Sequence, residues 1–182
     1  MRHNYLILKA MLGVLSLLFA ASAANADEFS IGASGVSAPV SLEESGTVVD
    51  GESTGWRVHG RYMFNKTFGI EGGLSKFGSP NDNSIPSNMH IDTESVDVYM
   101  VAAYPIGNDS VAYAKVGYIA WDSETEVNDS NPSHQTSTDL ALSIGGEYDL
   151  TERFGVRAEL EWFDSALKGE LKYSLGGVVR FK

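Results

Sequence analysis

Apolar and polar side chains alternate with a period of two through most of the chain after residue 26. Trp56 and Val58, for example, fall on one face of a segment, and Arg57 falls on the opposite face. Successive side chains of a β-strand point to opposite sides, so this period is typical of strands with one apolar face. The pattern predicts eight strands, over residues 28–36, 53–65, 68–75, 95–104, 111–121, 140–149, 154–163 and 171–181.

The segments between these strands alternate in length. Three connections are short and rich in turn-forming residues, namely 65–67, 106–110 and 149–153. Three others are long, polar and mostly acidic, namely 36–53, 78–93 and 122–137, and the last connection, 165–169, is brief. Short turns at one end and longer loops at the other predict an up-and-down antiparallel meander.

Eight such strands can close in two ways. A soluble, lipocalin-like barrel turns its apolar face inward around a ligand, whereas a membrane barrel turns that face outward to lipid. The polar face here carries charges of both signs in mid-strand: Arg57, Arg61, Glu71, Asp97, Lys115, Glu147, Arg157, Glu159, Glu161, Lys172 and Arg180. Charges of opposite sign can pair across a narrow lumen, and glycines between them leave room for long side chains.

Aromatic residues next to the short turns also favour the membrane barrel. They are Phe64, Phe68, Tyr104, Tyr148, Phe154 and Phe181, and they resemble an interfacial girdle. The predicted strands approach the 9–11 or so residues that cross a bilayer at a tilt. We therefore expect an all-β fold, an eight-stranded antiparallel up-and-down transmembrane β-barrel.

The first 26 residues have the layout of a secretory signal peptide. Arg2 and Lys9 precede an apolar run, and Ala24 and Ala26 form a small-residue cleavage pattern before Asp27. We expect cleavage there and a barrel domain over 27–182. Residues 1–26 hold two of the 13 basic residues and none of the 24 acidic ones, so the remaining chain carries a formal charge of −13. That charge argues against binding nucleic acid.

The end of the chain resembles the C-terminal signature of bacterial outer-membrane barrels. Ser174, Gly176, Val179 and Phe181 give its polar, glycine, apolar and aromatic positions in order. The resemblance implies recognition by the barrel assembly machinery. Lys182 departs from the signature, which usually stops at the aromatic residue.

More widely, the chain resembles the small eight-stranded outer-membrane barrels similar to the OmpA transmembrane domain. The phrases "FNKTFGIEGG", "YAKVGYIAWD" and "GGEYDLTERFGVRAELEWF" carry the likeness. The family implies a barrel in the outer membrane of a Gram-negative bacterium, with its turns in the periplasm and its loops outside. We expect a monomer in contact with outer-membrane lipid and lipopolysaccharide. The family also implies a lumen salt-bridge cluster of Glu71, Lys115, Glu147 and Arg157. We expect no C-terminal periplasmic domain after this barrel, so the resemblance does not imply peptidoglycan anchoring.

Three functions are compatible with this barrel. We expect a structural and surface-interaction role, with acidic loops facing divalent cations, lipopolysaccharide or a host ligand. A small porin-like channel of low conductance is the alternative. A lipid A-modifying enzyme is the third, but His59, His90 and His134 show no triad spacing. Asp122, Glu124 and Glu126 alternate, so their carboxylates face one way as in a cation site, but the segment does not supply the full set of oxygen ligands that calcium needs. We expect no catalytic residue, metal or cofactor.

Overall fold

The structure, a computed structural model, describes residues 28–44, 47–78, 89–127, 133–163 and 170–181. Eight strands follow one another along the chain: β1 (Glu28–Glu44), β2 (Thr47–Met63), β3 (Phe68–Phe77), β4 (Met89–Pro105), β5 (Ser110–Val127), β6 (Ser133–Asp149), β7 (Phe154–Phe163) and β8 (Glu170–Phe181). Among the described residues, no helix is long and apolar enough to cross a membrane.

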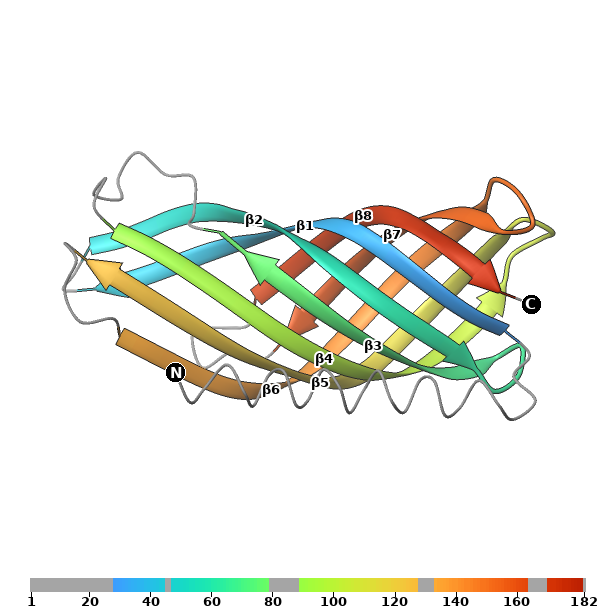
Figure 1. The fold of residues 1–182 in the computed structure, drawn as a ribbon, viewed down its shortest axis with the longest axis horizontal. Coiled ribbons are helices and arrows are strands. Elements are labelled where there is room, and N and C mark those ends of the chain that lie inside the picture. The colour runs from blue at the N-terminus through green and yellow to red at the C-terminus, as the bar shows by residue number, and fades with distance from the viewer. Residues whose placement is uncertain (1–27, 45–46, 79–88, 128–132, 164–169, 182) are drawn as a thin grey trace.

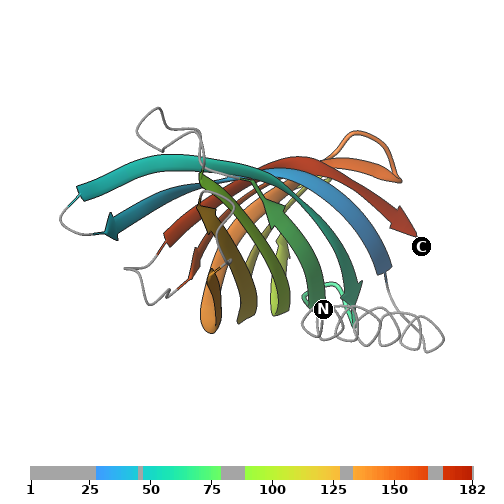
Figure 2. The ribbon, with the colours of Figure 1, turned by 60° about the vertical axis from the view of Figure 1, so that its left-hand side comes forward.

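Each strand pairs antiparallel with the next, and β8 returns to pair with β1 (Figure 1). Figure 2 shows β1 lying between β2 and β8. The closing ladder runs from Phe29 opposite Phe181 to Ser37 opposite Tyr173. Closure removes the free edge that an open sheet would expose, which is a requirement inside a bilayer. The predicted fold class is confirmed.

Five of the strands, β1, β2, β4, β5 and β6, extend six or more residues past their predicted ends. Residues 36–44 and 47–53 form the ends of β1 and β2, so the expected long connection over 36–53 is wrong. Likewise β4 begins at Met89, β5 continues to Val127, and β6 begins at Ser133. The sequences of these extensions are rich in polar and acidic residues and contain Pro39 and Gly51, so they resemble loops rather than half-buried strands. They project past the shorter β3, β7 and β8 (Figure 1).

Pro39 illustrates why the extension of β1 is compatible with its sequence. It lies two residues beyond Ser37, where pairing with β8 ends. Proline lacks the N–H group that a ladder on both sides would need, and is therefore tolerated on an edge. Among the strands that the structure describes, β2 is the one that pairs with the extension of β1, up to Glu44 opposite Thr47.

The polar face of every strand turns inward. Arg57, His59 and Arg61 are buried in the lumen, whereas Trp56 and Val58 lie on the outer wall. Strand β7 alternates between exposed and buried along its whole length. A soluble barrel would leave this apolar wall in water, at a cost of about 1.5–3 kcal/mol for each large side chain. Lipid removes that cost, so the outer wall fits a membrane.

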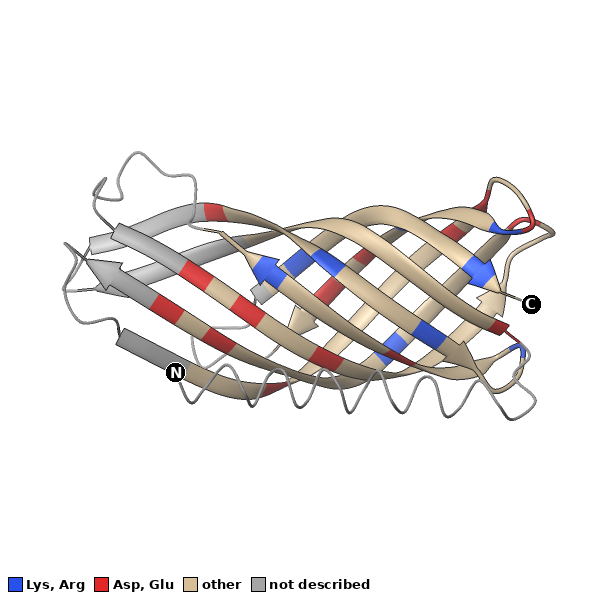
Figure 3. Cartoon of the chain, in the orientation of Figure 1, with Lys and Arg blue, Asp and Glu red and all other residues tan. Residues whose placement is uncertain are grey.

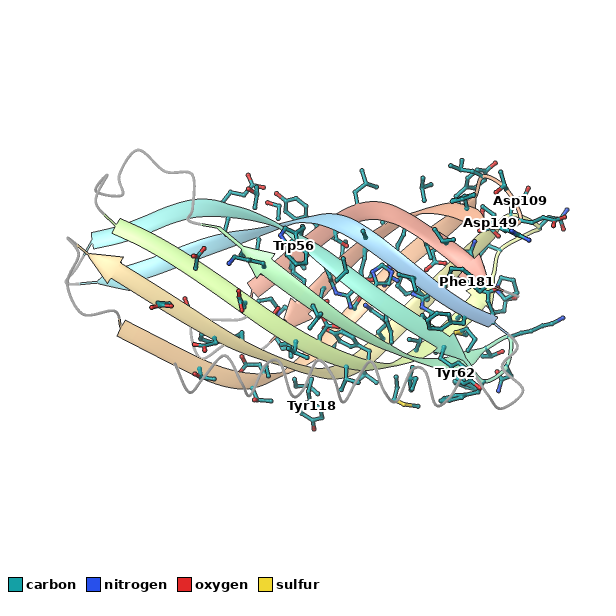
Figure 4. All side chains as sticks on the ribbon, in the orientation of Figure 1. Trp56, Tyr62, Asp109, Tyr118, Asp149 and Phe181 are labelled. Atoms are coloured by element: carbon teal, nitrogen blue, oxygen red, sulfur yellow. The ribbon has the colours of Figure 1, made fainter. Side chains whose placement is uncertain are left out.

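Aromatic side chains mark both limits of the apolar wall. The six predicted aromatics beside the short turns are all on the outside and exposed. A second group lies about eight residues further along the strands and consists of Trp56, Tyr118, Trp162 and Tyr173. Figure 4 shows Trp56 and Tyr118 at a similar height along the barrel and Phe181 near the short-turn end. Eight residues of a strand tilted by about 40° rise about 20 Å, near the ~25 Å apolar band of such barrels.

Candidate functional site

The centre of the lumen is a network of ion pairs around one carboxylate, Glu71 on β3. Its side chain is fully buried. Arg57 Nη2 and Arg61 Nη2 reach it from β2 at 3.0 and 2.8 Å. Lys115 Nζ approaches from β5 and Arg157 Nη1 from β7, each at 2.8 Å. Four cationic side chains therefore share one anion, and each remaining positive charge needs another partner.

Three further carboxylates supply those partners. Asp97 Oδ1 accepts from Arg57 at 2.6 Å, and Glu147 Oε1 lies 2.7 Å from Arg61 Nη1. Glu159 is paired with both Lys115, at 2.7 Å, and Arg157. The network thus contains four cations and four carboxylates, and its formal charge is zero. We call these eight residues the lumen network: Arg57, Arg61, Glu71, Asp97, Lys115, Glu147, Arg157 and Glu159. Figure 3 shows the two signs interleaved along the middle of the barrel.

Two buried tyrosines pack against the cations of the lumen network. The guanidinium carbons of Arg61 and Arg157 lie 4.5 and 4.7 Å from the Tyr113 ring centroid. Lys115 Nζ lies 4.3 Å from the Tyr99 ring centroid. Cations are attracted to the face of an aromatic ring, more so where water is excluded. The Tyr113 hydroxyl also donates to Glu159 at 2.9 Å, which ties its ring to the network.

His59 belongs to the same buried region. Its Nε2 lies 2.9 Å from Arg157 Nη1. A guanidinium can only donate, so Nε2 accepts and the proton of the neutral ring sits on Nδ1. The ring therefore serves as a hydrogen-bond acceptor for Arg157. His90 and His134, the other candidate histidines, have side chains outside the described residues.

A second set of ion pairs fills part of the lumen at the short-turn end. Arg180 on β8 lies 2.6 Å from Glu147 Oε2 and is also paired with Asp149. Its Nε lies 3.2 Å from Glu28 Oε1 at the start of β1. Arg180 thereby joins the last strand to the first and to the lumen network through Glu147.

Apolar side chains fill the lumen on either side of the network. Towards the short-turn end, Met63, Val101, Ala103 and Tyr113 form one buried cluster. Towards the long-strand end, Tyr99, Ile119, Ala141 and Phe163 form another. A pore wide enough for water would leave its lining accessible, but Glu71 and Arg157 are 0% and 2% exposed. The lumen is a packed interior at these levels.

Glycines opposite the two tyrosines make this packing possible. Gly117 faces Tyr99 and Gly145 faces Tyr113 across neighbouring strands. A Cβ at Gly117 would lie 2.8 Å from Tyr99 Cδ1, and a Cβ at Gly145 would overlap the Tyr113 phenol. Such contacts are too close for real atoms, so a larger residue would displace the ring.

The structure brings the four predicted cluster residues into one network. Lys115 and Arg157 both contact Glu71, and Arg157 Nη1 also lies 3.7 Å from Glu147 Oε1. The predicted site omits four members: Arg57, Arg61, Asp97 and Glu159. Their positions on the charged face of the predicted strands are the signal that could have included them.

The predicted assembly signal lies in β8. Val179 and Phe181 are on its outer face, and Phe181 packs at 5.9 Å from the Phe29 ring of β1. Ser174 and Gly176 lie between them and the start of β8 and fall on the lumen side. Ala24 and Ala26, the predicted cleavage residues, are outside the described residues.

Acidic residues gather on β4 and β5 beyond the second aromatic group (Figure 3), and they alternate in step with the outward-facing residues of these strands. Glu94 lies directly opposite Asp122, and Asp92 opposite Glu124. Lys76 Nζ on β3 is 3.3 Å from Glu94. The side chain of Glu126 is outside the described residues. Within the described part of the chain, no three acidic, histidine or cysteine side chains are placed to hold a metal ion.

Known proteins share this architecture. The chain is similar to outer membrane protein A of Escherichia coli O157:H7, with 26% identity over 103 residues, covering 57% of this chain. The alignment spans 30% of that relative's length. Among solved structures, Ail of Yersinia pestis superposes with a TM-score of 0.64 at 20% identity, over 85% of this chain and 98% of Ail. OprG of Pseudomonas aeruginosa also has a TM-score of 0.64, at 15% identity, over 86% of this chain and 96% of OprG.

The family comparison covers more of the chain than the individual relatives do. The family described as "Outer membrane protein beta-barrel domain" matches residues 10–174. This match agrees with the closed eight-stranded barrel, its apolar outer wall and its aromatic limits. The protein is therefore an integral protein of the Gram-negative outer membrane and belongs to the outer membrane protein β-barrel domain family.

Proposed function

We propose that this barrel is a structural and surface-interaction protein of the cell envelope, without catalytic or pore activity. The observation that carries the proposal is the burial of the lumen network between two apolar clusters. Side chains at several levels would have to move before ions could pass. A plugged lumen leaves the outer surface as the part of the protein that can meet partners.

The projecting strands are the proposed interaction surface. Asp92, Glu94, Asp122 and Glu124 lie on one outward face of β4 and β5, beyond the second aromatic group. Carboxylates directly opposite each other repel, and a cation between them relieves that repulsion. We propose that this face meets divalent cations, and through them the phosphates of lipopolysaccharide or an extracellular ligand. Ail has been solved with the heparin analogue sucrose octasulfate. An acidic face would repel such a sulfated ligand, so we do not extend that ligand to this chain.

The remaining parts of the proposal concern export and assembly. Residues 1–26 would be removed after Ala26, and residues 27–182 would form a monomeric barrel with its short turns in the periplasm. Ser174, Gly176, Val179 and Phe181 would be read by the barrel assembly machinery. In support, Phe181 lies at the closing seam of the barrel beside Phe29.

Planar-bilayer recording of the purified protein tests the central part. We expect no resolved conductance steps for the natural chain. Replacing Ile119 and Phe163 with serine should introduce steps, because these two side chains fill the lumen above the network. Regular steps from the natural chain would instead support a low-conductance channel. Analysis of lipid A from cells with and without the protein tests the absence of enzymatic activity, and an altered lipid A profile would contradict it.

A further inference from the structure

A groove runs across the lipid-facing wall on the side of β4 to β8. Its main part has a volume of about 750 Å³, and a smaller hollow of about 340 Å³ continues it towards the short turns. The two parts share Ala112 and Ala158. We call the combined feature the lateral groove.

Small residues form the floor of the lateral groove. Ala112 lies opposite Gly146, and Gly146 lies opposite Ala158, so three small residues adjoin across β5, β6 and β7. Ala102 and Ala114 face each other in the next row. The floor is therefore a patch where the barrel wall carries hardly any side-chain volume.

Large side chains stand along the groove. Tyr104, Ile144 and Leu175 are 72%, 62% and 69% exposed, among the most exposed apolar side chains of the described wall. Tyr104 stands on β4 at one side, and Leu175 on β8 at the other. Apolar walls over an alanine floor leave room for something with a hydrocarbon surface.

The barrel itself does not account for the glycine in this floor. A Cβ at Gly146 would meet only the Val111 carbonyl oxygen at 3.7 Å, an ordinary contact. At the preceding residue, Gly145, the lumen side is blocked by Tyr113. The open space at Gly146 therefore lies outside the barrel, on the side that lipid occupies.

The position of the lateral groove in the membrane indicates what kind of molecule binds there. It lies between the two aromatic groups, within the hydrocarbon band, and its smaller part reaches Ile106 and Tyr148 beside the short turns. Another copy of the barrel is a poor fit, since two convex walls touch along a narrow line and leave a furrow between them unfilled. A flexible hydrocarbon chain can lie along the furrow and contact its floor and both walls. We propose that the lateral groove binds an acyl chain of a phospholipid whose headgroup lies at the short-turn end.

The choice of phospholipid rests on the orientation in the proposed function, because the periplasmic leaflet of an outer membrane consists of phospholipid. The binding of an acyl chain can be tested without assuming this orientation, if the lipid probe is present in both leaflets. The protein is reconstituted in vesicles of phosphatidylethanolamine and phosphatidylglycerol that contain a phospholipid with a photoreactive diazirine in its acyl chain. Both leaflets then offer the probe. After illumination, crosslinked peptides are mapped by mass spectrometry.

We expect crosslinks at groove positions to exceed those on the β1–β3 side of the wall at least threefold. Ala112→Leu should reduce the groove crosslinks at least threefold, because it fills the floor. Ala120→Leu is the matched control: it is the same change on the outer face of the same strand, outside the groove, and it should leave them unchanged. Heat-modifiability on gels verifies that each variant is folded.

Three results would overturn the proposal. They are an even distribution of crosslinks around the wall, an equal effect of Ala112→Leu and Ala120→Leu, and protein–protein crosslinks across the groove, which would point to a second copy. Repeating the experiment with a diazirine-labelled lipopolysaccharide in the leaflet at the long-strand end decides the source of the chain. Stronger groove labelling from that leaflet would contradict the phospholipid assignment.

Discussion

The lumen and the outer wall of this barrel reverse the usual distribution of side chains in a protein. In the lumen, Glu71 and Arg157 are buried as ions, whereas Met100 and Leu142 lie on the outer surface. Each region is stable only in its own surroundings, because buried ions need opposite charges and exposed apolar groups need lipid. One alternating pattern therefore specifies two different environments: polar residues for the packed lumen and apolar residues for the surface in contact with the membrane.

The largest expected effect comes from removing the centre of the lumen network. Glu71→Ala leaves four cationic side chains without their shared anion, and loss of one partner of a buried ion pair costs about 3–5 kcal/mol. We expect at least this loss in the free energy of unfolding, measured by urea titration in lipid vesicles. Asp97→Ala, which removes the partner of Arg57 alone, should cost less. Equal stability of Glu71→Ala and the natural chain would mean that the network does not hold the lumen together.

A charge on the outer wall tests the other region. Met100→Arg places a cation in the middle of the apolar band, where the expected cost is about 2–4 kcal/mol. Thr136→Arg adds the same side chain on an exposed site beyond the second aromatic group, and its cost should be below about 1 kcal/mol. Similar losses for both variants, measured in the same unfolding assay, would argue against the assigned position of the band.

Neighbouring glycines sharpen the comparison further, since Gly145 faces the lumen and Gly146 faces lipid. Gly145→Ala forces a methyl group into the Tyr113 phenol, and overpacking of this kind costs about 1–3 kcal/mol. Gly146→Ala has room and should change the free energy of unfolding little. We expect Gly145→Ala to lose more stability than Gly146→Ala. A larger loss for Gly146→Ala would mean that Gly146, and not Gly145, faces the lumen.

The smallest effect belongs to the exposed ion pair above the membrane. Lys76 and Glu94 are partly exposed, and such pairs contribute about 0–1 kcal/mol. Lys76→Ala should therefore leave stability nearly unchanged, and the small effect should shrink further in 1 M salt. A salt-independent loss above 2 kcal/mol or so would assign this pair to the stable core instead.

The apolar alternation predicted the fold because it follows directly from burial. Trp56, Arg57 and their successors fall on the expected faces, since a half-buried strand must alternate. The ends of the long strands could not be found in the same way. Val36 and Ala38 are still buried, but polar residues, Pro39 and Gly51 interrupt the alternation beyond them, while backbone pairing continues to Glu44 opposite Thr47.

The sequence predicted that the lumen holds ion pairs, but it did not predict all of the residues that belong to the network. The charged face indicated that ions meet in the lumen, but the pattern of a single strand does not give the heights of residues on different strands. Arg61 lies directly opposite Glu71, and Asp97 reaches Arg57, only because of the register between β2, β3 and β4. The lumen clusters around Met63 and Phe163 were likewise hidden, because apolar residues on a charged face look like breaks in the pattern.

The central claim, that ionic side chains face the lumen and apolar ones face lipid, can be measured directly on β7. The chain contains no cysteine, so single cysteines at each position from 154 to 163 carry unique fluorescent labels. In vesicles that contain a lipid-borne quencher, we predict strong quenching at Val156, Ala158 and Leu160 and weak quenching at Gly155, Arg157 and Glu159. Strong quenching at Gly155, Arg157 and Glu159 instead, or equal quenching at all positions, would contradict the claim that apolar side chains face lipid.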